Sequence, residues 1–238
     1  MIGIIVQLAI SWLLAWLLEK KDLGVLGFRP TKKRVMDAGL FFTIAVICAA
    51  SGYFMRTYFG ERWILNPFFT WRLLAEGVWW NIKSVLYEEL IFRGVILYIL
   101  IKRVGVIWAI IISAVAFGIY HWFSFEIIGN VKQMIVVFIF TGAAGLLYAY
   151  VYTRTFSLYI PCVLHLGWNF TRNFIFSDGN IGNGALMMTR PDHTTTVSYF
   201  TYVVVIYFPM LAFLIISFFL LKKRKQIEPT IEGRGSQV

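Results

Sequence analysis

The chain has 238 residues, of which 59% are hydrophobic and 14% are charged, and its formal net charge is +10. A soluble domain of this length needs more polar surface, so the composition excludes a soluble globular protein and indicates an integral membrane protein. The basic residues collect just outside apolar runs, as juxtamembrane residues facing anionic lipid do. We therefore expect membrane lipid, and no nucleic acid, as a partner.

Seven apolar segments approach the length of about 20 residues that a helix needs to cross a bilayer. In chain order they are roughly 2–18, 37–55, 84–101, 104–123, 133–152, 156–176 and 198–221. The shorter segment 71–82 mixes charged residues with leucines and tryptophans, which predicts an interfacial helix leading into the third span. The predicted fold is all-α, a polytopic membrane bundle of about seven transmembrane helices.

The two ends of the chain and its charge distribution complete this outline. The first apolar run has no basic region before it and no cleavage site after it, so it is predicted to be a retained span within a single transmembrane domain over residues 1–227. Residues 228–238 contain IEGRGS, typical of a protease-site linker of recombinant origin, and are predicted to be a flexible tail. Most Lys and Arg residues fall in the loops after spans one, three and five and after the last span. The positive-inside rule then predicts a cell-membrane protein with its N-terminus outside and its C-terminus in the cytoplasm.

The segment YEELIFRG, residues 87–94, puts three charges into the third predicted span. A carboxylate near the bilayer centre costs roughly 2.5–3.5 kcal/mol on insertion scales and usually marks a functional site. Glu89 and Arg93 are four residues apart, so they share a helix face and are expected to pair. Glu88 lies about 100° around the helix and has no local partner, which makes it the candidate for chemistry. The alternative is a helix end at which both acids are simply hydrated.

Two of the three histidines also fall within predicted spans. His121 follows Phe117 by one turn, and the small Gly118 between them allows close approach of another helix. His165 precedes Asn169 by one turn. The predicted depths of these groups and of Glu88 converge on one cavity inside the membrane. A lone intramembrane histidine is as often a structural hydrogen-bonding group as a catalytic one, but this combination favours an active site.

A carboxylate, two imidazoles and an amide can hydrolyse a peptide bond without a nucleophilic serine or cysteine. Glu88 would take a proton from water that His121 helps to orient, and His165 and Asn169 would stabilise the oxyanion. The alternative is a catalytic zinc ion held by Glu88, His121 and His165. No HExxH pair is present, and we favour the version without a metal or other cofactor.

Three motifs follow one another on separate predicted helices: EExxxR from Glu88, FxxxH from Phe117 and HxxxN from His165. Together they resemble the CPBP family of intramembrane proteases, which includes CAAX prenyl endopeptidases and bacteriocin-processing proteins and is also called the ABI family. The resemblance covers about residues 80–175, the expected catalytic core. It implies a hydrolase in which the first glutamate and first histidine activate water and the second histidine and the asparagine bind the oxyanion. Glu89 and Arg93 would support them.

The resemblance leaves the substrate open, because its members act on prenylated C-termini, process peptides or regulate partner membrane proteins. We expect an intramembrane endopeptidase acting on a membrane-associated protein or peptide, which is prenylated in part of the family. One alternative is a non-catalytic scaffold or regulator that binds another membrane protein through the same helices. A second alternative is a proton or solute pathway, although the sequence shows no inverted repeat.

Overall fold

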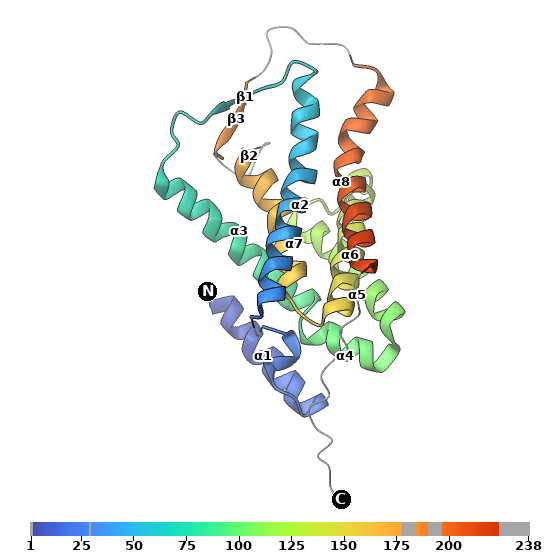
Figure 1. Cartoon of the computed structure of the whole chain (residues 1–238). Coiled ribbons are helices and arrows are strands. Elements are labelled where there is room, and N and C mark those ends of the chain that lie inside the picture. The colour runs from blue at the N-terminus through green and yellow to red at the C-terminus, as the bar shows by residue number, and fades with distance from the viewer. Residues whose placement is uncertain (1, 29, 178–183, 190–196, 224–238) are drawn as a thin grey trace, which may run out of the picture.

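A computed structural model of the chain describes residues 2–28, 30–177, 184–189 and 197–223, and it is built almost entirely of helices (Figure 1). The α-helices in these residues are α1 Ile2–Glu19, α2 Lys32–Thr57, α3 Trp71–Phe92, α4 Val95–Val104, α5 Val106–Ser124, α6 Val131–Thr155, α7 Tyr159–Phe170 and α8 Tyr199–Lys222. The shorter elements are the 3-10 helix η1 Leu23–Leu26, the π-helix η2 Thr171–Ile175, and the strands β1 Arg62–Leu65, β2 Phe176–Ser177 and β3 Leu186–Thr189. The predicted tail at 228–238 lies outside the described residues.

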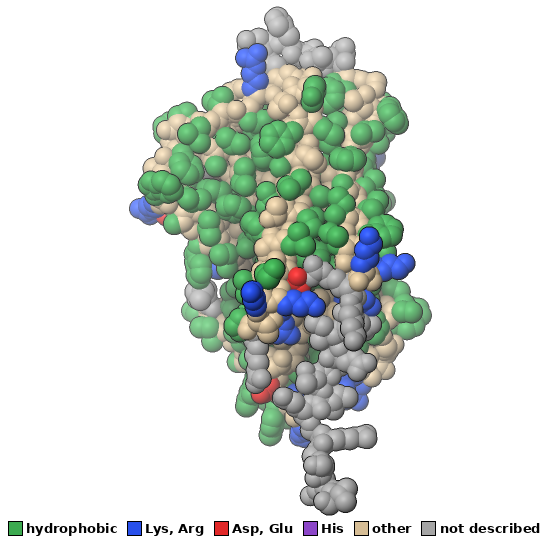
Figure 2. Space-filling view, viewed as in Figure 1, with side chains coloured by type: hydrophobic (Ala, Val, Ile, Leu, Met, Phe, Trp, Pro, Cys, Tyr) green, Lys and Arg blue, Asp and Glu red, His purple; other side chains and the backbone are tan. Residues whose placement is uncertain are grey.

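Within the described part of the chain, five helices are long and apolar enough to cross a membrane: α1, α2, α5, α6 and α8. Many of their large apolar side chains face outward, and hydrophobic side chains are spread over the height of the face in Figure 2. Such a surface is unfavourable in water and suits the hydrocarbon of a bilayer. The structure thus confirms an all-α, multi-pass membrane bundle.

The third predicted span has a different form from the one expected. The predicted interfacial helix at 71–82 and the beginning of the span at 84–101 form one continuous helix, α3, which ends at Phe92. The chain turns at Gly94, where an added Cβ would lie 2.1 Å from the carbonyl oxygen of Leu90, so only glycine fits. The remainder becomes α4, whose ten residues are too short to cross a bilayer.

The ends of two other helices also differ from the predicted spans, for local reasons. α2 begins at Lys32, ahead of the span predicted at 37–55, because the Thr31 hydroxyl accepts a hydrogen bond from the N–H of Arg34 at 3.2 Å and caps the first turn. α7 is shorter than the span predicted at 156–176, since it begins at Tyr159 and passes into η2 after Phe170.

The centre of the bundle consists of α2, α5, α6, α7 and α8. Their buried side chains form one apolar cluster that includes Phe117, Tyr148 and Phe213. α5 and α6 pack closely at Gly118, where an added Cβ would lie 2.7 Å from Cδ2 of Phe138. The close helix approach predicted for Gly118 is therefore confirmed.

α1 lies outside this cluster, against α3, α4 and η1. It begins partway down the molecule, beside the second half of α3, and runs toward the lower end in Figure 1. At its beginning, an added Cβ on Gly3 would lie 3.3 Å from Cε2 of Tyr87. At its end, Glu19 pairs with Lys102 of α4. α1 is thus fixed near both ends, and its first turn lies next to the turn of α3 that carries the acids.

A small sheet that the sequence did not predict lies near the upper end of α2 in Figure 1. Its strand order is β1-β3-β2, with β1 antiparallel and β2 parallel to β3. Tyr53 of α2 stacks on Phe176 with ring centroids 4.4 Å apart and meets the edge of Trp63 at 5.2 Å. Strands of two to four residues are too short to show the alternating pattern that identifies a strand in a sequence.

Candidate active site

The last turn of α3 places Glu88 and Glu89 inside the bundle. α3 begins after Thr70, whose hydroxyl accepts a hydrogen bond from the N–H of Leu73 at 3.0 Å, and runs without a break to Phe92. Both acids are buried, with 7% of Glu88 and none of Glu89 exposed. Adjacent residues of a helix point about 100° apart, so the two carboxylates face different surroundings.

Glu89 faces Arg93, as the sequence predicted. Nη1 of Arg93 donates to Oε1 of Glu89 at 3.2 Å, and neither side chain is exposed. Nη2 donates to the carbonyl oxygen of Gly145 on α6 at 3.4 Å. The guanidinium also lies over the ring of Phe117, 4.1 Å from its centroid, and 5.2 Å from that of Tyr148. The charge of Arg93 is thus held by a carboxylate, a carbonyl and two aromatic faces.

His165 of α7 is fixed by hydrogen bonds at both ring nitrogens. Its Nδ1 lies 2.8 Å from Oε1 of Glu89, and its Nε2 lies 3.0 Å from Nδ2 of Asn169. Because a carboxylate only accepts, Nδ1 carries the proton, and Nε2 of the neutral ring accepts from the Asn169 amide. Tyr148 stacks on the imidazole with centroids 5.0 Å apart. These contacts fix the ring orientation and the tautomer.

His121 of α5 is held by its own helix. Its Nδ1 lies 2.8 Å from the carbonyl oxygen of Phe117, one turn earlier, so Nδ1 donates and Nε2 is free to accept. The ring of Phe117 packs edge-on against the imidazole at 4.5 Å. Phe117 also contacts His165, at 5.8 Å between ring centroids, so one buried phenylalanine separates and supports both histidines.

Glu88 faces the two Nε2 atoms. Its Oε2 lies 3.7 Å from Nε2 of His165 and 3.9 Å from Nε2 of His121. The same Oε2 is buried and has no hydrogen-bond partner among the described residues. These separations are too long for direct hydrogen bonds, and one water molecule among the three atoms can donate to the carboxylate and to a histidine. The structure brings together all four predicted catalytic residues, from α3, α5 and α7.

The same three side chains are the set considered for zinc. Two imidazole Nε2 atoms and a carboxylate, each imidazole with its Nδ1–H donated elsewhere, are typical donors for a catalytic zinc ion. The lone pair of His165 Nε2, however, already accepts from Asn169. Among the described residues, no three His, Cys, Asp or Glu side chains are placed to hold a metal ion.

A groove leads to Glu88 from the side on which α1 packs. It has a volume of about 260 Å³. Its lining comes from the beginning of α1, from α3 and from α5, and consists of Gly3, Ile4, Trp80, Lys83, Ser84, Tyr87, Glu88 and Tyr120. The groove connects Glu88, the candidate general base, with the surface of the described part of the bundle.

Sequence reasoning missed two residues of α6 that complete the site. Gly145 accepts from Arg93 through its carbonyl and leaves room for it, since an added Cβ would lie 3.3 Å from Nη2 of Arg93. Tyr148 lies between Arg93 and His165 and is 1% exposed. Both residues fall in the apolar run 133–152, where a glycine and a tyrosine carry no signal of their own.

The fold and the site define a class: a polytopic membrane protein with a carboxylate between two histidines inside the bundle. A comparison with models of protein families gave a match that covers the helices of this site. Residues 67–171 match the model of the type II CAAX prenyl endopeptidases called Rce1-like. This match spans all three motifs and confirms the resemblance to the CPBP family, which is a family of proteases. Searches among curated proteins and among solved structures gave no match.

Proposed function

We propose that the chain is an intramembrane endopeptidase that hydrolyses a peptide bond of a membrane-associated protein or peptide. The observation that carries the proposal is the buried Oε2 of Glu88, which faces the Nε2 atoms of His121 and His165 and has no partner among the described residues. Burying a carboxylate oxygen without a hydrogen-bond partner costs free energy, and residues buried in this way inside a membrane are typically functional.

Water activation follows from the tautomer of His121. Since Nδ1–H donates to the carbonyl of Phe117, Nε2 presents a lone pair toward Glu88. A water molecule then donates one hydrogen to Oε2 of Glu88 and the other to Nε2 of His121. Glu88 takes the first proton as the oxygen attacks the substrate carbonyl carbon, and it returns that proton to the leaving amine nitrogen.

Oxyanion stabilisation falls to Asn169 and His165. The Asn169 amide has two N–H groups, one of which is used by His165, so the second is free to donate to the oxyanion. His165 becomes a donor only as an imidazolium, because its neutral Nε2 accepts from Asn169. Glu89, Arg93 and Phe117 act in this scheme as positioning residues.

We further propose that the protein resides in the cell membrane with the lower end of Figure 1 toward the cytoplasm. Most of the Lys and Arg side chains visible in Figure 2 lie in its lower half, as the positive-inside rule requires. In this orientation α1 runs toward the cytoplasmic side, in keeping with the predicted outside N-terminus, and the C-terminus is predicted to be cytoplasmic. The match to the prenyl endopeptidase family suggests a substrate with a lipid anchor, and an unmodified membrane peptide is the alternative.

The proposal is tested with purified protein and a library of fluorogenic peptides, prenylated and unmodified. We expect wild-type protein to cleave a subset of them, and Glu88→Gln and His121→Ala to lose at least a hundredfold of that rate. Glu76→Gln, the same substitution on the exposed part of α3, is the matched control and should retain full activity. Cleavage that persists in Glu88→Gln would refute the mechanism. A biological activity that survives both substitutions would favour the scaffold.

A further inference from the structure

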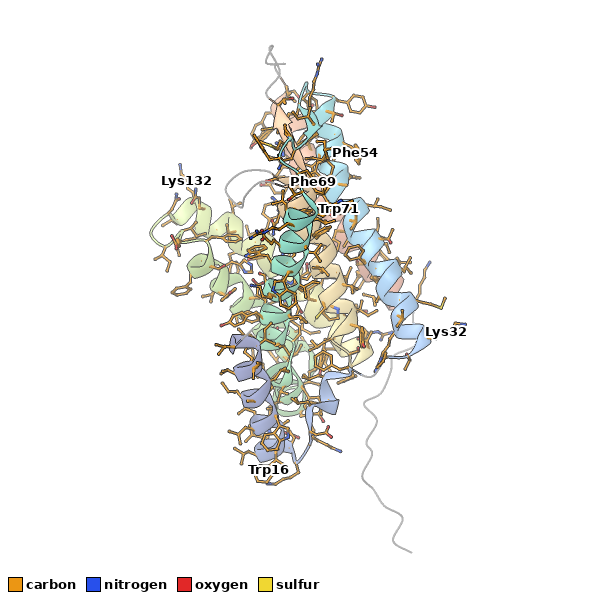
Figure 3. The ribbon with its side chains drawn as sticks, turned by 90° about the vertical axis from the view of Figure 1, so that its left-hand side faces the viewer. Trp16, Lys32, Phe54, Phe69, Trp71 and Lys132 are labelled. Carbon is orange, nitrogen blue, oxygen red and sulfur yellow. The ribbon has the colours of Figure 1, made fainter. Side chains whose placement is uncertain are left out.

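One face of α3 carries a row of polar side chains that leads away from Glu88. Asn81, Ser84 and Glu88 lie within an arc of about 60° on the helix, because residues three, four and seven positions apart share a face. In Figure 3, α3 begins at Trp71 and runs downward. Asn81 therefore lies above Glu88 by about two turns, roughly 10.5 Å along the helix axis.

Asn81 is buried with one polar atom unpaired. The residue is only 2% exposed, and its Nδ2 donates to the carbonyl oxygen of Gly77 at 2.8 Å. Because a carbonyl only accepts, this contact fixes the orientation of the amide and directs Oδ1 away from Gly77. Oδ1 is buried and has no hydrogen-bond partner among the described residues. An unpaired buried acceptor costs free energy, and ordered water is the usual partner of such an atom.

Ser84 connects this amide with the groove that reaches Glu88. Ser84 lines the groove together with Glu88, whereas Asn81 does not belong to the lining. The hydroxyl of Ser84 has no partner in the described part of the chain. One turn above Asn81, an added Cβ on Gly77 would lie 2.2 Å from Cδ2 of Phe174, so the helix packs tightly there. The polar row is thus closed beside Gly77 and open toward the groove.

We propose that Asn81 and Ser84 bind water molecules beside Glu88 and resupply the water that hydrolysis consumes. This inference rests on the proposed function, because it takes Glu88 as the group that activates water. Each cleaved peptide bond takes up one water molecule, whose hydroxyl is added to the acyl carbon and whose proton goes to the leaving nitrogen. Two water molecules with the Ser84 hydroxyl between them form four hydrogen bonds of about 2.8 Å each, about the separation of Asn81 and Glu88 along the helix.

A retained supply matters because a bound substrate fills the groove. A peptide that lies against Glu88 displaces the water in the groove, and the hydrocarbon around the bundle supplies none. Asn81 lies outside the lining, so water bound to its Oδ1 stays in place when the substrate enters. Asn81 and Ser84 are positioning residues in this scheme, since they act on the reaction through water.

The first test is structural and does not depend on cleavage. It is a crystal structure of the wild-type protein grown in lipidic cubic phase, at a resolution that shows ordered water. We expect one water molecule within hydrogen-bond distance of Oδ1 of Asn81 and a second between Ser84 and Glu88. A dry Oδ1, or an Oδ1 paired with a protein group, would overturn the proposal.

The second test replaces the buried amide. Asn81→Leu removes the acceptor and keeps a side chain of similar size. We expect kcat for a cleaved peptide to fall about tenfold and KM to change by less than about twofold, as for the loss of one hydrogen bond that acts on water and not on the substrate. Asn81→Ser should retain most of the rate, because its hydroxyl can donate to the carbonyl of Gly77 and still accept from water.

A matched pair of serine variants tests the second water site. Ser84→Ala should also lower kcat. Ser217→Ala is the control, because the Ser217 hydroxyl is likewise buried without a described partner but belongs to α8, which contributes nothing to the groove lining. It should leave kcat unchanged. Equal effects of the two substitutions would show that loss of a buried hydroxyl, and not the row beside Glu88, changes the rate.

Thermal melts separate a hydrated amide from a dry one. If Oδ1 of Asn81 is dry, Asn81→Leu removes an unpaired polar atom and raises Tm. We expect Tm to stay the same or to fall, so a raised Tm, or an unchanged kcat, would overturn the proposal. Failure of the endopeptidase proposal has a different signature, because the wild-type protein then cleaves no peptide, whatever the crystal structure shows at Asn81.

Discussion

Replacing Arg93 by methionine should destabilise the protein far more than replacing an exposed arginine in the same helix. Arg93 and Glu89 form an ion pair with no exposed surface on either side chain. Methionine keeps much of the apolar volume but leaves the carboxylate of Glu89 with the Nδ1–H of His165 as its only described partner. Breaking a buried pair in this way costs about 3–5 kcal/mol.

That cost is large enough to measure as a thermal shift. For a chain of this size, 1 kcal/mol corresponds to roughly 2–4 °C in Tm, so we expect Arg93→Met to lower Tm by about 10 °C. The assay is tryptophan fluorescence during heating in detergent. Arg72→Met is the matched control, because Arg72 and Glu76 have the same spacing on α3 while their side chains are 87% and 61% exposed. It should leave Tm almost unchanged.

The double variant Glu89→Gln/Arg93→Met decides whether the unpaired charge causes the loss. A neutral amide at position 89 can still accept from Nδ1 of His165, so the double variant should be more stable than Arg93→Met alone. If the effects of the two single substitutions simply add, or if Arg93→Met and Arg72→Met behave alike, the pair does not hold the site together.

Three further predictions concern packing, metal and the attachment of α1. Gly145→Ala should lower the free energy of unfolding by about 1–3 kcal/mol, because the added Cβ would lie 3.1 Å from Cα of Ala114. Gly142→Ala is the control and should be neutral, because the nearest atom to its added Cβ is 3.9 Å away. Thermal melts of both variants test this prediction. Treatment with 1,10-phenanthroline should leave peptide cleavage unchanged and elemental analysis should find no stoichiometric zinc, while restoration of a lost activity by zinc would show a metal enzyme. Glu19→Gln should loosen α1 and raise hydrogen exchange at its end, and unchanged exchange would show that the pair with Lys102 does not hold the helix.

The membrane class, the helical fold and the convergence of the site were all predictable from the sequence. Charged and histidine residues inside apolar runs are conspicuous, because the bilayer makes them costly. The spacing of Glu89 and Arg93 predicted their ion pair, and the structure confirms it at 3.2 Å. The roles assigned to Glu88, His121, His165 and Asn169 stay predictions, since proximity alone does not show what each group does.

The break of the third span was not predicted, because hydropathy does not report backbone geometry. Residues 84–101 are uniformly apolar around YEELIFRG, and a glycine inside a membrane helix is common. Only the three-dimensional contact between Gly94 and the carbonyl of Leu90 shows that the chain turns there. Tyr148 and Gly145 were missed for a related reason. Both matter because of their contacts with Arg93 or His165, which lie outside α6.

The break after α3 also explains how two adjacent acids come to face different surroundings. The tight turn at Gly94 ends α3 just after Arg93, whose backbone N–H still donates to the carbonyl of Glu89 at 2.8 Å. Arg93 therefore keeps the one-turn geometry that its pair with Glu89 requires, and it points toward α6. The 100° step along the helix then turns Glu88 away from the guanidinium, toward α5, α7 and the groove. Because Arg93 neutralises Glu89 and leaves Glu88 without a partner among the described residues, Glu88 is the carboxylate to which the proposed function assigns the chemistry.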